Sequence, residues 1–92
     1  MGAFRARFQM GRLTATPAAV GVISRDKLFQ LVERHLQGDW GDVTDGDAKA
    51  NECTVRNGDR IISWYSVSGG ERIMIITEAD RSVTTVLLAH EY

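Results

Sequence analysis

The chain has 92 residues, an apolar share of 43% and a net charge of -1, which together indicate one globular domain over residues 1–92. This composition excludes a disordered chain, and the small net charge gives no overall attraction to nucleic acid or to an anionic membrane. Cys53 is the only cysteine, so an intrachain disulfide is excluded. With neither a membrane-spanning segment nor the apolar stretch of a secretion signal, the sequence predicts a cytoplasmic protein.

The first stretch of the chain is basic. Its arginines, all of which precede the first acidic residue, are Arg5, Arg7 and Arg12. Residues 1–6 are expected to form a flexible basic tail. Phe8 and Met10 are separated by one polar residue, and this alternation predicts a short strand within residues 7–14 that adds to the edge of a sheet.

Two helices are predicted next. The pair Thr16–Pro17 is typical of a helix start, because Thr caps the first turn and Pro lacks an N–H that would have no partner there, so a short helix is expected over 17–23. Ser24 caps a second and stronger helix, over 25–37. Its apolar face follows the helical repeat and consists of Leu28, Leu31, Val32 and Leu36. We expect this face to lie across a sheet.

A third helix is predicted over 45–56. Thr44 with Asp47 three residues later resembles a capping box, and Asn57–Gly58 is typical of a helix end. Its apolar residues are few: Ala48, Cys53 and Val55. This helix should therefore be the most exposed of the three, or it should pack against something else.

The last third of the chain predicts three strands, over 60–67, 71–77 and 82–88, in which apolar and aromatic residues alternate or run together. The short turns between them favour antiparallel pairing, and the apolar middle strand should lie at the centre. The sequence thus predicts an α+β fold, in which two to three N-terminal helices pack on a C-terminal antiparallel sheet of three to four strands. The order along the chain is one strand, three helices and three strands.

The loop over 38–42 is the least ordinary local feature. Trp40 stands between glycines and aspartates, and it either plugs the core or lies exposed as an anchor for a partner, together with Asp39 and Asp42. The acidic residues nearby lack the spacing of a calcium loop, and no Cys/His set has zinc spacing. We therefore expect no metal and no cofactor.

His35 lies at the edge of the apolar face of the second helix, where a histidine is commonly a boundary residue hydrogen-bonded to a neighbour. The functional alternative is a general base, since imidazole titrates near neutral pH. In that case Arg72 or Arg81 would balance phosphate charge, and Tyr65 or Thr84 would support the site. Tyr65 and Arg72 share a surface if the hairpin register allows it.

The turn between the last two strands is dense in polar groups. One interpretation is a local ion network of Glu78, Asp80 and Arg81 that fixes the turn. The other is a binding site in which Arg81 contacts a phosphate or a carboxylate. These three residues are therefore candidate binding residues.

Four stretches of the chain, RHLQGDWGDV, GDRIISWYS, ITEADRSVTTVLL and a final EY, resemble a group of small bacterial proteins of plasmids and other mobile elements. The resemblance runs from about Gly11 to Tyr92, and GDWGD and ITEADRS are its most specific parts. Members of the group commonly carry Pro-Glu where this chain has Ala89–His90. The group has no established activity, so the resemblance implies a setting in the mobile gene pool and no mechanism.

Two functions from different classes remain open. The first is a small accessory protein without catalytic activity, which binds a protein partner or associates with itself. The alternative is a metal-independent ribonuclease of the toxin type, on the analogy of helices followed by an antiparallel sheet in the barnase-like layout. Nucleic-acid binding is permitted by the N-terminal arginines but is not favoured by the net charge, and no membrane partner is expected.

Overall fold

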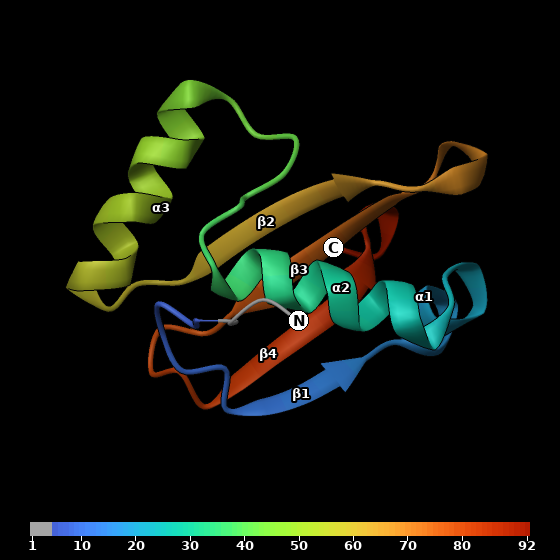
Figure 1. Ribbon diagram of the computed structural model, residues 1–92, viewed down its shortest axis with the longest axis horizontal. Coiled ribbons are helices and arrows are strands. Elements are labelled where there is room, and N and C mark those ends of the chain that lie inside the picture. Colours follow the sequence, from blue (N-terminus) through green and yellow to red (C-terminus); the bar gives the residue numbers. More distant parts are fainter. Residues whose placement is uncertain (1–4) are drawn as a thin grey trace.

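The structure, a computed structural model that describes residues 5–92, has a four-stranded sheet at its centre (Figure 1). The helices and strands are β1 (Arg12–Ala15), α1 (Pro17–Val22), α2 (Arg25–Leu36), α3 (Asp45–Asn57), β2 (Ile61–Ser66), β3 (Arg72–Thr77) and β4 (Val83–Leu88). Two short 3-10 turns, Ser68–Gly70 and Ala89–Glu91, follow β2 and β4. The predicted α+β class and the predicted order of elements are confirmed.

The sheet is mixed, and the prediction that it is antiparallel is wrong for one strand. The order of strands is β1-β4-β3-β2, and β2, β3 and β4 form the expected antiparallel meander with β3 inside the sheet. β1 pairs in parallel with β4, with Arg12 aligned to Val83. A short turn favours antiparallel pairing only between the two consecutive strands that it joins. Three helices and two strands separate β1 from β4, so no turn dictates their relative direction.

One face of the sheet, the first face, is covered by α1 and α2 (Figure 1). Its buried apolar residues are Tyr65, Ile73, Ile75, Val86 and Leu88. They pack against Ala19 of α1 and against the predicted apolar residues of α2, which are Leu28, Leu31, Val32 and Leu36. Burying the four aliphatic side chains of α2 contributes roughly 6–12 kcal/mol before conformational entropy is subtracted. The packing of α2 on the sheet is thus as its sequence pattern predicts.

The opposite face, the second face, has a smaller apolar cluster. Its members are Met74, Ile76 and Leu87, which are buried, and Ile62 and Trp64, which are half-buried. Figure 1 shows α1 and α2 in front of the sheet, whereas α3 stands beyond the β2 edge. The second face is therefore covered mainly by its own long side chains.

α3 is attached to the sheet by polar contacts, which agrees with its thin apolar stripe. Asn51 is its buried residue, and the side-chain amide binds both backbone groups of Ile62: Nδ2–H donates to the carbonyl oxygen at 2.8 Å, and Oδ1 accepts from N–H at 3.4 Å. Cys53, which was predicted to lie in the apolar stripe of this helix, is exposed. Asn51 therefore acts as a short substitute for a neighbouring strand at the β2 edge.

The loop after α2 closes the rest of this edge. The Trp64 N–H donates to the carbonyl oxygen of Trp40 at 3.1 Å, and the Asp42 N–H donates to that of Trp64 at 2.7 Å. Gly41 passes so close to the Trp64 carbonyl that a Cβ would not fit, and its φ of +76° favours glycine independently. The β2 edge is thus protected against pairing with another strand.

The N-terminal segment departs from the sequence prediction. Residues 1–4 of the predicted tail lie outside the described residues, and residues 5 and 6 are exposed. The strand begins only at Arg12, because Gly11 takes a φ of +67° and turns the chain. Residues 5–11, called the strap below, instead pass the end of α2, where the Arg7 N–H donates to the Leu36 carbonyl oxygen at 2.8 Å.

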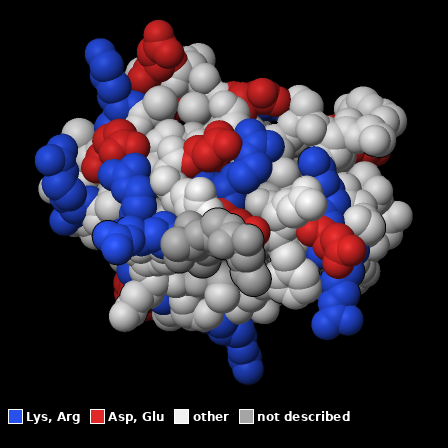
Figure 2. Space-filling view, viewed as in Figure 1, with Lys and Arg blue, Asp and Glu red and all other residues white. Residues whose placement is uncertain are grey.

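The helix-covered side of the molecule carries both signs of charge. Figure 2 shows Lys and Arg side chains interspersed with Asp and Glu over this side. Such a surface does not attract a polyanion as a whole. Within residues 5–92, no helix has the length and apolar character needed to cross a membrane.

Candidate functional site

His35 lies fully buried between α2 and the first face, within a continuous chain of hydrogen bonds. Its Nδ1 is 2.6 Å from the Ser63 hydroxyl, and its Nε2 is 2.9 Å from the Thr77 hydroxyl. The Thr77 hydroxyl is 2.7 Å from that of Thr84. The Thr84 hydroxyl in turn donates to the carbonyl oxygen of Met10 at 2.8 Å. The chain thus joins α2, three strands and the strap.

The last acceptor of this chain fixes the direction of the protons as far as Nε2 of His35. A carbonyl oxygen only accepts, so Thr84 must donate to Met10 and accept from Thr77. The Thr77 hydroxyl then accepts from Nε2–H of His35, and the remaining nitrogen, Nδ1, accepts from the hydroxyl of Ser63. This is the arrangement of the neutral imidazole with its proton on Nε2, which burial favours over the imidazolium.

Burial keeps His35 neutral. Desolvation lowers the pKa of His35 from 6.5 to about 3. The rings of Phe8 and Trp40 lie beside the imidazole, with centroids 5.3 and 6.1 Å away. A general base must reach its substrate, and this imidazole has neither an exposed atom nor a free nitrogen. The chain of hydrogen bonds therefore stabilises the core and does not form an acid–base site.

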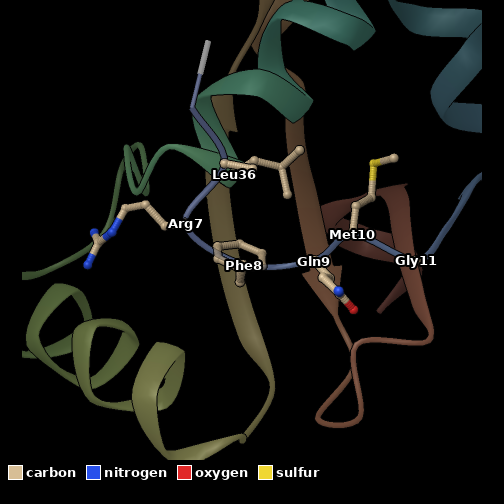
Figure 3. A pocket seen from close by; sticks show the side chains of 7 residues that line it. Arg7, Phe8, Gln9, Met10, Gly11 and Leu36 are labelled. Atoms are coloured by element: carbon tan, nitrogen blue, oxygen red, sulfur yellow. The ribbon is translucent and has the colours of Figure 1, made fainter.

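The strap lies against this chain of hydrogen bonds, with Phe8 beside His35 and the Met10 carbonyl oxygen bonded to Thr84. Figure 3 shows its side chains from close by, beside Leu36 at the end of α2. Arg7 makes a two-pronged ion pair with Glu52 of α3, at 2.9 and 2.6 Å. A hollow of about 680 Å³ runs along residues 6–11 and Leu36. Since Arg7 is already paired, it contributes little to an N-terminal surface for nucleic acid.

Tyr65 and Arg72 lie on opposite faces, so the expectation that they share a surface is wrong. The register pairs Tyr65 with Ile73 and Ser66 with Arg72, which places the two side chains one step out of phase. The Tyr65 hydroxyl donates to the Asp39 carbonyl oxygen at 2.6 Å, and burial raises the pKa of Tyr65. Arg72 instead lies over the Trp64 ring at 4.9 Å, on the second face.

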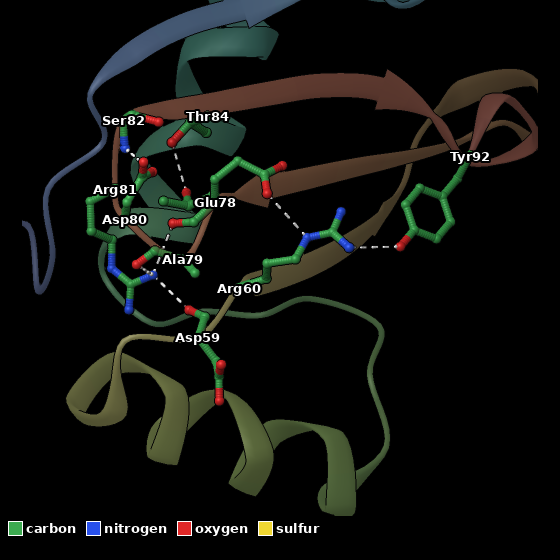
Figure 4. A network of polar contacts seen from close by, with 10 residues as sticks. Asp59, Arg60, Glu78, Ala79, Asp80, Arg81, Ser82, Thr84 and Tyr92 are labelled. Atoms are coloured by element: carbon green, nitrogen blue, oxygen red, sulfur yellow. Dashed lines mark hydrogen bonds and ion pairs between the residues drawn. The ribbon is translucent and has the colours of Figure 1, made fainter.

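Arg81 is held by backbone carbonyl groups (Figure 4). Its guanidinium donates to carbonyl oxygens at 2.6 to 3.2 Å, those of Thr54, Asp59, Glu78 and Ala79. Thr54 lies in the last turn of α3, where its carbonyl oxygen also accepts from the Gly58 N–H at 3.0 Å and where a cation is favourable to the helix dipole. Arg81 therefore fastens the end of α3 to the β3–β4 turn and is not presented to a ligand.

The predicted ion network of the turn is also different. Arg81 binds no carboxylate there, because its donors are taken by carbonyl oxygens. Glu78 pairs with Arg60 across the start of β2, at 3.3 Å. Asp80 accepts from the Ser82 N–H at 3.0 Å, and hydrogen bonding with the Ser82 side chain and then with this N–H lowers the pKa of Asp80. The turn is fixed by its polar groups as expected, but by other partners.

Trp40 plugs the core, as the first of its two interpretations predicts. It is 5% exposed, and its indole N–H donates to Glu52 at 3.2 Å. Asp39 is paired with Arg34 at 2.7 Å, and this hydrogen bond holds the pKa of Asp39 below its usual value. Asp42 accepts from the N–H and the hydroxyl of Ser66. The loop is therefore satisfied internally and offers no free anchor.

These positions do not assemble the ribonuclease site that the sequence allowed. His35, Tyr65 and Thr84 are buried on the first face, Arg72 lies on the second face, and Arg81 lies in the turn. Within residues 5–92, no cluster of His, Cys, Asp and Glu could hold a metal ion. Within residues 5–92, the catalytic candidates therefore do not meet in one site.

An open site does exist where α3 meets the second face. A groove of about 350 Å³ lies there. Its apolar lining consists of Val43, Ala50, Ile62, Trp64, Met74 and Tyr92, and its polar lining of Asp47, Asn51, Thr54 and Arg60. Tyr92 is 65% exposed and is held by Arg60, which donates to its hydroxyl at 3.3 Å (Figure 4). The apolar surface of this groove comes from the half-buried Ile62 and Trp64 and from Tyr92.

Sequence reasoning missed most of this groove. The signal was present in the strand alternation, which gives β2 and β3 a second apolar set that includes Trp64 and Met74. One amphipathic helix covers one face, and α3 is too polar to cover the other. The role of Asn51 carried no such signal, because a polar residue in a polar helix predicts exposure.

Comparisons of the chain with family models, with curated proteins and with solved structures found no match. The resemblance to small proteins of mobile elements therefore stays a prediction. The candidate site rests on its own geometry.

Proposed function

We propose that the chain is a protein-binding module without catalytic activity, and that its binding surface is the groove between α3 and the second face. One observation carries this proposal: an open groove is lined by the half-buried Ile62 and Trp64 and by the exposed Tyr92, whereas Met74, which also lines it, is itself buried. Apolar surface that is left accessible between ordered elements is typical of an interaction site.

The chemistry of the lining supports a protein ligand. Trp64 and Tyr92 are of the residue types that concentrate binding energy at protein interfaces. The charged residues of the lining, Asp47 and Arg60, are of opposite sign, so the groove selects neither a polyanion nor a polycation. Arg60 is moreover paired with Glu78, which reduces its attraction for phosphate.

The polar residues elsewhere support binding rather than catalysis. His35 is enclosed, and Arg81 is held by carbonyl groups. A reaction needs groups that reach the substrate, and these groups do not. The resemblance to proteins of mobile elements adds an expected setting, an accessory role in the bacterial mobile gene pool, which the genomic neighbourhood of close homologues would test.

The proposal is tested by filling the groove. Ala50 of α3 is exposed and lines the groove, and Arg is a good helix former, so Ala50→Arg should fold and obstruct the site. The matched control is Ala18→Arg, an exposed alanine of α1 on the helix-covered side. Peptides are selected from a displayed random library on the wild-type protein, and their affinities for both variants are measured by fluorescence polarisation.

We expect the selected peptides to bind the wild-type protein and Ala18→Arg equally. Their affinity for Ala50→Arg should fall by about tenfold or more, the size of effect that loss of one interface anchor produces. Selected peptides that bind Ala50→Arg as tightly as the wild-type protein contradict the proposal. A selection that yields no binder contradicts it as well.

A further inference from the structure

The two sides of the sheet are covered unequally. The first face has a complete helix layer, whereas the second face has α3 only along its β2 edge (Figure 1). Met74, Ile76 and Leu87 of the second face are already buried within the single chain. The apolar surface that a partner would cover on this side is therefore that of the half-buried Ile62 and Trp64 and of the exposed Tyr92.

The charges on this side are separated. Asp47 stands on the α3 wall of the groove and is exposed. Arg72 is exposed on β3 and lies over Trp64, and within residues 5–92 it has no ion pair with a carboxylate. An acid thus lies on one side of Trp64 and an unpaired base on the other.

Such a pattern is complementary to itself. A two-fold axis in the plane of the face, running along β2 near Trp64, exchanges the two sides of that strand. It brings Asp47 of one copy opposite Arg72 of the other, and the reverse contact forms at the same time. Trp64 and Ile62 then lie near the axis, against the same residues of the second copy.

We propose that the second face is an interface between two copies of this chain, in which α3 of each copy covers the open face of the other. The proposal names the partner of the groove and so rests on the proposed function. The groove side of α3 includes Ala50 and Thr54, which are small and permit a close approach to a sheet. Each copy thus covers the half-buried Ile62 and Trp64 of the other.

The outline of the molecule sets an upper limit on the size of such an interface. A stable interface buries about 800 Å² on each partner. The two longer extents of the molecule are 34 and 30 Å, and they lie in the plane of Figure 1, in which the sheet is seen face-on. The other routes are less open, because α1 and α2 cover the first face and the β2 edge is already bonded.

The test uses two charge reversals on the full chain. Arg72→Glu gives a copy in which both sides of the patch are acidic, and Asp47→Arg gives one in which both sides are basic. Sedimentation equilibrium measures the mass of the wild-type protein, of each variant, of the double variant and of an equal mixture of the single variants. Matched controls on the helix-covered side are Asp26→Arg and Lys27→Glu, which change exposed residues of α2.

The wild-type protein and both controls are expected to be dimers. Each single reversal should weaken dimerisation by about tenfold or more, because it places like charges opposite each other in both contacts. The double variant restores the pairing with its signs exchanged, so it should dimerise again. The mixture of the two single variants should form a heterodimer, and circular dichroism checks that each variant is folded.

Three results would overturn the proposal: a monomeric wild-type protein, dimers that ignore the reversals, or single variants that remain monomeric when mixed. These results leave the proposed function standing if selected peptides still lose affinity for Ala50→Arg. Failure of peptide binding together with intact charge-dependent dimers has the opposite meaning, because the groove then serves self-association alone.

Discussion

The two faces of the sheet are formed by the same strands but are covered differently. On the first face, aliphatic packing under α2 surrounds a hydrogen-bonded chain from Ser63 to Met10, and His35 in that chain is fully buried. On the second face, a small apolar cluster is bordered by exposed arginines and by a groove. Polar groups on the first face hold the fold together, whereas Asp47 and Arg72 beside the second face remain exposed to a partner.

This difference shows how a residue type can mislead about function. A buried histidine with two hydroxyl neighbours has the composition of a catalytic site, but a carbonyl acceptor fixes the proton on its Nε2 and burial keeps the ring neutral. The lining of the groove contains no histidine between hydroxyl groups. Accessibility therefore separates the two faces more clearly than chemistry does.

The largest expected effect breaks the first face at its polar centre. His35→Ala removes a buried ring and leaves the hydroxyls of Ser63 and Thr77 without that partner, so the free energy of unfolding should fall by about 3–5 kcal/mol. Phe29→Ala, on the same helix at a side chain that is 46% exposed, should cost about 1 kcal/mol or less. Urea denaturation measures both values, and equal losses contradict the structural role of His35.

The next largest loss of stability is expected at the β2 edge, which the loop after α2 closes. Gly41→Ala places a Cβ against the Trp64 carbonyl at a φ of +76°, and we expect a loss of about 2–4 kcal/mol. Gly58→Ala is the matched control, because Gly58 has a φ of +80° with open space around it and should cost about 1 kcal/mol. If thermal unfolding gives the same loss for both glycines, the loop does not close the β2 edge as described.

Acid should weaken the first face selectively. The folded pKa of His35, about 3, lies below its unfolded value of 6.5, so protonation favours the unfolded chain. The stabilisation by neutral His35 is complete above pH 6.5 and is lost as the pH falls below it, by about 1.4 kcal/mol per pH unit. Between pH 6.5 and 4.5 the free energy of unfolding should therefore fall by about 2–3 kcal/mol.

Denaturation curves at a series of pH values measure this acid limb. His35→Gln, which cannot be protonated in this range, should flatten it if the variant remains folded. Carboxylates such as Asp39, whose pKa Arg34 holds below its usual value, lose their stabilisation only at lower pH. A wild-type curve that is flat between pH 6.5 and 4.5 contradicts the burial of a neutral imidazole.

The smallest effect on folding belongs to the second face. Arg72→Gln removes an exposed contact with the Trp64 ring, so the free energy of unfolding should change by about 0.5 kcal/mol. The same change removes the base opposite Asp47 in the proposed dimer and should weaken association. Denaturation at low concentration and sedimentation separate the two effects. A large loss of stability without a change in association reverses the roles assigned to the faces.

The sequence predicted the first face well because its signal is periodic. The spacing of Leu28, Leu31 and Leu36 specifies a helix with one apolar side, and strict alternation specifies which strand residues meet it. The depth of His35 was not predictable in the same way. Its burial depends on Ser63 and Thr77, which are distant in the chain, and on Phe8 of a strap that resembled a strand.

The remaining misses have a common physical origin. The direction of β1 depends on how three helices return the chain to the sheet, and no local pattern records that path. The partners of Arg81 are backbone carbonyl groups, which every residue carries, so side-chain chemistry alone suggested carboxylates or phosphate instead. Sequence patterns therefore defined elements and faces better than they defined polar partners.

The most direct test of the contrast between the faces follows methyl signals by NMR as the protein is diluted. Isoleucine and methionine provide probes on both sides: Ile62 and Met74 on the second face, and Ile73 and Ile75 on the first. Our account predicts that the signals of Ile62 and Met74 shift with concentration while those of Ile73 and Ile75 stay fixed. Equal shifts on both faces, or no shift on either, would contradict it.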